Sequence, residues 1–183
     1  MQTVRRPLIA GNWKMNLDSV TSEKLSNEVV TKAIGLNTDI LLCPPHVYLE
    51  RVNRIISTSL VKLGAQDCHA SPNGAHTGDI SPVMLRDVGC SFTIVGHSER
   101  RSDHFETNQI ILRKVKSAWD AGIKTIICVG ESAEERNSGK AIEVVQAQII
   151  GSVPDEATPE NTVVAYEPIW AIGSGKTPST EDV

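Results

Sequence analysis

Four polar side chains suited to acid–base chemistry follow apolar runs in this chain. Asn12 and Lys14 follow the first run, His97 follows the fourth, and Glu167 follows the sixth. A carboxylate can act as a general base, an imidazole can donate or move a proton, and an ammonium can hold an anion. If these residues meet, the set fits proton transfer on a small anionic substrate.

Glu167 comes directly after an apolar run and before the fixed backbone of Pro168. Partial burial at a strand tip is expected to raise the pKa of this carboxyl group towards that of a useful general base. The alternative is a strand-terminal acid that pairs with a neighbouring cation. The glycine-rich segment that follows favours the functional interpretation.

His97 stands after Gly96 and before a predicted helix start. The amino terminus of a helix disfavours positive charge, so we expect a neutral imidazole that donates a hydrogen bond. A histidine that merely caps the helix explains the pattern equally well. Glu99 and the arginines after it are expected to form ion-pair scaffolding.

Asn12 and Lys14 belong to the segment GNWKMN. Gly11 is expected to let the backbone turn sharply at the strand exit, so that both polar side chains point over the edge of the sheet. Taken alone, these residues fit a polar loop with one surface lysine better than they fit a site.

The segment Ile172–Pro178 is rich in glycine and ends in a sequence, GKT, that matches the tail of a phosphate-binding P-loop. That motif also requires a glycine at the position where Trp170 stands, so a nucleotide-binding P-loop is disfavoured. Between Pro168 and Pro178, the composition indicates a lid that closes and offers backbone N–H groups to an anion.

Short apolar runs alternate with longer stretches of helical periodicity. This pattern predicts buried parallel strands joined by helical crossovers, in an open doubly wound sheet or a barrel. No GxGxxG follows the first run, which disfavours a dinucleotide-binding sheet. The predicted strands are Leu8–Ala10, Ile40–Cys43, Val61–Ala65, Phe92–Val95, Thr125–Val129 and Val163–Tyr166, and the predicted helices are Ser19–Ile34, His46–Ile56, Phe105–Ala121 and Glu134–Ile150.

Composition predicts one soluble globular domain over residues 1–183. Apolar residues make up 40% of the chain and the formal charge is −4, with no basic stripe that would suit nucleic acid. No apolar run is long enough for a membrane span. The four cysteines are scattered, which favours reduced thiols in a cytoplasmic protein, and the five histidines lack zinc-ligand spacing, so no metal is expected.

Four segments in register resemble the triosephosphate isomerase family: GNWKMN, AQD, VGHSERR and AYEPIWAIGSGKT. The resemblance runs from Leu8 to the last residue. It implies a TIM (β/α)8 barrel that interconverts dihydroxyacetone phosphate and glyceraldehyde 3-phosphate through an enediolate. It also implies a cytoplasmic enzyme of glycolysis and gluconeogenesis that needs neither cofactor nor metal.

The resemblance also assigns roles to individual residues. Glu167 would be the base, and His97 would polarise the carbonyl and move protons among the oxygens. Lys14 would supply positive charge, Asn12 would orient the substrate, and Gly173 would offer a lid amide to its phosphate. Ser98, Glu99 and Thr77 would support the site.

The loop Ser71–Asp79 resembles the segment that reaches into the partner's site in a homodimer and delivers Thr77 close to Asn12. An ordinary exposed loop is the alternative, and His76 departs from the aromatic residue common at its position.

The family's barrel has eight strands, whereas six are predicted here, and Ser179–Val183 has the sequence of a helix start. We therefore expect an incomplete barrel of very low activity, or an inactive fragment that needs further strands.

Overall fold

A single parallel sheet organises the molecule. The computed structural model describes residues 5–175 and 177–183. Its strands pair in sequential order, each parallel to the next. The strands are β1 (Leu8–Asn12), β2 (Asp39–Cys43), β3 (Lys62–Ala65), β4 (Phe92–Val95), β5 (Lys124–Val129) and β6 (Thr162–Tyr166). All six predicted runs are confirmed, and the boundaries move by at most two residues.

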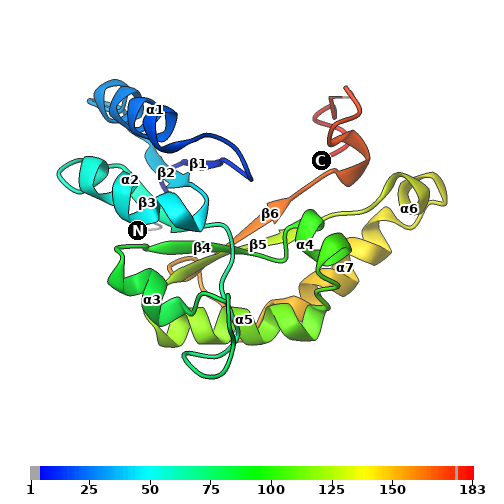
Figure 1. Cartoon of the computed structure of the whole chain (residues 1–183). Helices are drawn as coiled ribbons and strands as arrows, with labels where there is room; N and C mark the ends of the chain where they lie inside the picture. The colour runs from blue at the N-terminus through cyan, green and yellow to red at the C-terminus, as the bar shows by residue number, and fades with distance from the viewer. Residues whose placement is uncertain (1–4, 176) are drawn as a thin grey trace.

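The sheet curves as part of a barrel and has two edges. In the described chain β1 pairs with β2 alone and β6 with β5 alone. Helices α3 (Pro82–Asp87), α5 (Asn108–Asp120) and α7 (Ala141–Ser152) run along one side of β4 and β5, and α1 (Ser19–Lys32) and α2 (Leu49–Ile56) cover the other end of the sheet (Figure 1). The expected incomplete barrel of six strands is therefore confirmed.

Local capping explains where several helices begin. The side chain of Asp18 accepts a hydrogen bond from the Thr21 N–H at the start of α1 (Ser19–Lys32), and Thr107 does the same for Ile110 at the start of α5 (Asn108–Asp120). The predicted helix 46–56 is a 3-10 turn, η1 (His46–Tyr48), continued by α2 (Leu49–Ile56).

One predicted helix is interrupted in the structure, so the prediction of a single helix is wrong. The stretch 134–150 forms two helices, α6 (Ala133–Asn137) and α7 (Ala141–Ser152). Gly139 between them has φ +74°, a left-handed conformation that ends the first helix. Helices α3 (Pro82–Asp87) and α4 (Ser98–Asp103) were not delimited by periodicity, because neither exceeds two turns. A second 3-10 turn, η2 (Ile169–Ala171), follows β6.

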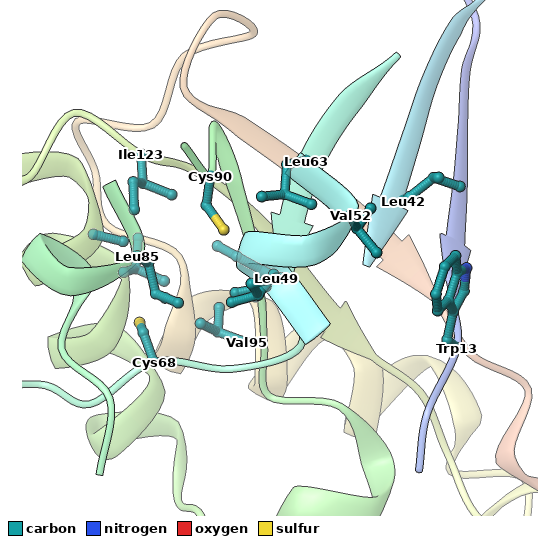
Figure 2. Packing of buried hydrophobic residues seen from close by; sticks show 14 of the residues in the cluster. Trp13, Leu42, Leu49, Val52, Leu63, Cys68, Leu85, Cys90, Val95 and Ile123 are labelled. Atoms are coloured by element: carbon teal, nitrogen blue, oxygen red, sulfur yellow. The ribbon is translucent and has the colours of Figure 1, made fainter. Parts of the chain in front are cut away.

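Alternating strand residues build two apolar layers. Leu42, Leu63 and Val95 face the helices and pack with Val52 and Leu85 (Figure 2). The opposite face of the sheet carries a smaller cluster formed by Leu41, Cys43, Phe92, Ile94, Ile126 and Cys128. All four cysteines are free and buried. Burial raises the pKa of the Cys43, Cys68 and Cys90 thiols to about 12, so they are unreactive packing residues.

The last described residues form turns instead of a helix. The Ser179 N–H and hydroxyl both donate to Asp182 Oδ2, at 2.8 Å each, as in half of a capping box. Arg136 of α6 also pairs with Asp182. No helix of the described chain is long and apolar enough to cross a membrane.

Candidate active site

A cavity of about 540 Å³ opens where the carboxyl ends of the strands meet. Residues that directly follow strands form much of its wall, as expected for parallel strands whose ends share one edge. The lining residues are Asn12, Lys14, Met15, Asn16, His46, Gln66, Asp67, His97, Glu99, Arg100, Asp103 and His104. Of the four residues predicted to meet, Asn12, Lys14 and His97 line this cavity together with the supporting residue Glu99, whereas Glu167 is not among its lining residues.

His97 is oriented by the start of α4. Gly96 turns the chain out of β4 with φ +68°, and a Cβ there would lie 2.8 Å from the Ile111 side chain, so glycine is required. The buried imidazole then caps the helix, and Nδ1 accepts a hydrogen bond from the Glu99 N–H at 3.2 Å. Because Nδ1 accepts, the ring carries its single proton on Nε2 and is neutral.

Glu167 accepts the hydrogen bond that the Nε2–H of His97 donates. Its Oε1 lies 2.8 Å from His97 Nε2, and its Oε2 accepts from the Ser98 N–H at 3.0 Å. The Glu167 N–H donates to the Val129 carbonyl at 2.7 Å. A Cβ on Gly130 would lie 1.8 Å from the Glu167 carbonyl oxygen, so only glycine at 130 lets the backbone of Glu167 lie where it does.

The expected rise in the pKa of Glu167 is wrong for this state of the site. Burial does oppose ionisation, but hydrogen bonds from His97 and Ser98 outweigh it and hold the pKa below its ordinary value. The sequence showed the burial at the strand tip, whereas the two donors come from a distant loop.

The turn after β1 also differs from the expectation. Gly11 lies inside the strand opposite Leu42, and the left-handed residues of the loop that follows are Lys14 and Leu17, with φ +51° and +73°. Asn12 Oδ1 accepts from the Lys14 N–H at 3.0 Å, and Gln66 Nε2 donates to the Lys14 carbonyl at 2.9 Å. These two amide side chains hold a backbone conformation that a lysine rarely adopts.

Gln66 is a site residue to which sequence reasoning assigned no role. It directly follows a predicted strand, the same signal that drew attention to His97. Its amide also donates to the Cys43 carbonyl at 2.9 Å, so it ties the ends of β1, β2 and β3 together.

Lys14 and Glu99 form an ion pair across the cavity mouth. Lys14 Nζ lies 2.7 Å from Glu99 Oε1, and both side chains are more than a third exposed. Solvent therefore screens the pair, and the ammonium remains available to an incoming anion.

A buried ionic network joins two residues of the cavity wall, Asp67 and Arg100, to Lys114 and Glu106. Lys114 Nζ contacts Asp67 at 2.7 Å and Glu106 at 2.6 Å, and Arg100 Nε contacts Glu106 at 2.6 Å and Asp67 at 3.0 Å. Burial raises the pKa of Asp67. Burial also opposes ionisation of Glu106, but Lys114 and Arg100 hold its pKa below the ordinary value.

Two predicted site residues lie elsewhere. Thr77 is exposed on the loop between β3 and α3, and Gly173 is exposed on the glycine-rich segment after η2, with φ +67°. Lys176 lies outside the described residues. The start of the glycine-rich segment is tied down, because Trp170 Nε1 and the Tyr166 hydroxyl donate to fully buried Glu131 at 3.0 and 2.9 Å.

Comparison with known proteins identifies relatives over nearly the whole chain. The triosephosphate isomerase family model matches residues 7–183. The triosephosphate isomerase of Brucella melitensis is 48% identical over 180 residues, covering 97% of this chain and 71% of the relative. That of Afipia carboxidovorans is 49% identical over 179 residues, with the same coverage.

A solved structure agrees. The crystal structure of triosephosphate isomerase from Bartonella henselae superposes with a TM-score of 0.86 at 44% identity, covering 91% of this chain and 69% of that chain.

Proposed function

Because the chain belongs to the triosephosphate isomerase family, we propose that Glu167 and His97 interconvert dihydroxyacetone phosphate and glyceraldehyde 3-phosphate. The observation that carries these roles is the 2.8 Å contact between His97 Nε2 and Glu167 Oε1 at the carboxyl end of the sheet. It joins a carboxylate and a neutral imidazole that has one proton to donate.

Substrate binding has to break this contact. The single Nε2–H of His97 serves Glu167 in the open site and cannot serve a substrate carbonyl at the same time. When the carbonyl oxygen takes that hydrogen bond, Glu167 keeps its burial and loses a donor. Its pKa then rises, which converts a resting carboxylate into a stronger base.

The freed Glu167 removes a proton from the carbon next to the carbonyl. Negative charge develops on the carbonyl oxygen as the enediolate forms, and the Nε2–H of His97 stabilises that charge. Glu167 then returns the proton to the neighbouring carbon, while His97 moves a proton between the two oxygens. The balance closes without an external oxidant or reductant, because one carbon is oxidised as its neighbour is reduced.

Positive charge and the lid hold the substrate's phosphate. The ammonium of Lys14 lines the cavity, and Asn12 positions the Lys14 backbone through its amide oxygen. The backbone amide of Gly173 would reach the phosphate when the glycine-rich segment closes. That closure would exclude water from the enediolate.

We also propose the homodimer that the resemblance implies. The exposed loop Ser71–Asp79 would reach the partner subunit's site and bring Thr77 close to Asn12. A cytoplasmic enzyme acting in glycolysis and gluconeogenesis fits this assignment.

Exchange of substrate hydrogen with solvent tests the roles directly. The purified chain is incubated with dihydroxyacetone phosphate in D₂O, and both deuterium uptake and isomerisation are followed by NMR. Glu167→Gln should lower both rates by about 10²–10⁴-fold, the usual contribution of a general base. Glu160→Gln, which removes an exposed carboxylate, should leave both unchanged. Full exchange in Glu167→Gln would contradict the proposal, and wild-type exchange no faster than in buffer would favour the alternative of an inactive fragment that needs further strands.

A further inference from the structure

Another cavity, of about 390 Å³, lies at the amino ends of the strands. Because the strands are parallel, their first residues share one edge of the sheet, opposite the edge that carries the candidate active site. In the described chain the two cavities have no lining residue in common. This amino-end cavity is lined by the first residue of each of five consecutive strands: Leu8, Asp39, Lys62, Phe92 and Lys124.

Positive charge predominates in the amino-end cavity. Its lining residues include four cations and two carboxylates, an excess of two positive charges in a chain whose formal charge is −4. A concave surface lined by charge of one sign attracts small ions of the other sign. The charged residues that line the cavity in the described chain are Arg5, Arg6, Lys62, Lys124, Asp39 and Glu160.

Asp39 neutralises part of this charge. Its Oδ2 accepts a hydrogen bond from Lys62 Nζ at 2.8 Å, and its Oδ1 lies 3.6 Å from Arg6 Nε. The hydrogen bond from Lys62, supported by the charges of Lys62, Arg6 and Lys124, holds the pKa of Asp39 below its ordinary value. Both carboxylate oxygens are therefore ionised and already engaged at neutral pH.

Two exposed cations remain without a carboxylate partner. Among residues 5–175 and 177–183, neither Arg5 nor Lys124 forms an ion pair. Arg5 uses one Nη2–H on the Thr162 carbonyl, at 3.3 Å, and its other donors are not committed to a carboxylate. A cluster of ion pairs that only closes the end of the sheet is the alternative, and it does not account for these two charges.

The ring of Phe92 holds two ammonium groups at the cavity. Lys62 Nζ lies 6.0 Å and Lys124 Nζ 5.8 Å from its centroid, within the range of a cation–π contact. Phe92 is itself buried, so the ring is fixed. The lysines are therefore positioned at the cavity before any ligand arrives.

We propose that the amino-end cavity binds a small polyanion that carries two linked phosphate groups, as in a diphosphate. A guanidinium presents paired N–H donors to phosphate oxygens, and an ammonium acts on them as a point charge. The cations come from three segments of the chain, so two linked phosphates contact more of them than one phosphate does. The volume lies within the usual range of small-molecule sites. This inference is independent of the proposed isomerase activity.

The two phenylalanines of the chain provide a direct readout of binding. Phe92 lines the amino-end cavity, whereas Phe105 is 81% exposed and follows His104 of the catalytic cavity. The full chain is labelled with 4-fluorophenylalanine, and its two ¹⁹F resonances are assigned with Phe105→Leu. Sodium diphosphate should shift the Phe92 resonance saturably. A shift at Phe105 reports diphosphate at the catalytic cavity instead.

Variants locate the binding energy. The Kd obtained from the Phe92 resonance should weaken by about fivefold in each of Arg5→Gln and Lys124→Met, because each removes an exposed cation that has no carboxylate partner. Lys116→Met removes an exposed lysine of α5 outside the cavity and is the matched control. Raising the salt concentration to about 1 M, where the Debye length is about 3 Å, should weaken binding further.

Circular dichroism verifies that each variant is folded. All the substituted cations are exposed, so folding is expected to survive their loss. An unmoved Phe92 resonance at millimolar diphosphate, a shift confined to Phe105, or equal Kd values for Lys124→Met and Lys116→Met would each overturn the inference.

Discussion

One ring proton at His97 decides what the imidazole can do in the open site. The Glu99 N–H occupies Nδ1, so the proton lies on Nε2 and points at Glu167. The same bond lowers the pKa of Glu167, against the effect of its burial. The basicity of the carboxylate is therefore coupled to the hydrogen-bonding state of one imidazole.

Titration of the Glu167 carboxyl carbon by ¹³C NMR, assigned with Glu167→Gln, measures this coupling. Because its pKa is depressed, the group should remain ionised below the ordinary value of 4.5. In His97→Leu, which removes the donor and keeps the site apolar, the midpoint should move upward.

Ser98→Ala ranks the donors in the same titration. Ser98 donates to Glu167 through its backbone N–H, and its hydroxyl also lowers the pKa of Glu167, so loss of the hydroxyl should raise the midpoint by less than loss of the His97 imidazole does. A wild-type midpoint above 4.5, or a downward shift in His97→Leu, would show that burial dominates instead.

Gly130 is a second residue-scale constraint. Gly130→Ala places a methyl group 1.8 Å from the Glu167 carbonyl oxygen, which forces the strand tip to move. We expect a loss of about 1–3 kcal/mol in the free energy of unfolding, as for other overpacked sites, together with slower isomerisation. Urea denaturation measures the loss. At Gly11, where a Cβ would meet nothing closer than 3.7 Å, the same substitution should be tolerated far better; equal losses at the two positions would refute the steric explanation.

At the scale of elements, the ionic network joins α5 to the loops after β3 and α4. Lys114 extends from α5 and is 5% exposed, and its ammonium contacts two carboxylates that are themselves buried. Such a network holds elements in position because each carboxylate depends on a cation from another segment. Removal of one partner leaves charge buried without compensation.

Lys114→Met should therefore destabilise the fold by about 3–5 kcal/mol, the usual effect of breaking a buried ion pair. Equilibrium unfolding in urea at neutral pH measures the change. Lys116→Met removes an exposed lysine from the same helix, whose nearest carboxylate lies at 4.0 Å, and should change stability by less than about 0.5 kcal/mol. Comparable effects of the two substitutions would mean that the buried network contributes little.

At the scale of the whole molecule, the two edges of the sheet expose apolar residues. In the described chain β1 and β6 each present one unpaired side, and Ile9 and Val164 on these strands are 63% and 45% exposed. Unpaired apolar edges favour association with other strands. The chain is therefore expected to self-associate as its concentration rises.

Sedimentation velocity over a concentration series tests this expectation. Ile9→Lys and Val164→Lys place a charge on each edge and should shift the distribution towards monomer. Val47→Lys, at an 81% exposed apolar residue on η1, controls for added charge alone. If Val47→Lys disperses the chain as well as the edge variants do, charge and not edge pairing governs the association.

Periodicity and local residue types were sufficient to predict the strands and their parallel direction, but they left open whether the sheet is doubly wound or part of a barrel. Runs such as Phe92–Val95 are buried on both faces, and a polar residue directly after such a run must lie at one edge of a parallel sheet. The division between α6 and α7 was missed, although Gly139 was its visible signal. Helical periodicity continues across a single left-handed residue and hides the break.

Only the tertiary structure decides which residues distant in the sequence become hydrogen-bond or ion-pair partners. Glu167 and Ser98 are 69 positions apart, and their hydrogen bond reverses the expected direction of the Glu167 pKa. Gln66 reaches Lys14 through folded loops that no local pattern specifies. Secondary structure follows from neighbours in sequence, whereas protonation and ion pairing depend on which groups packing places within a few ångströms.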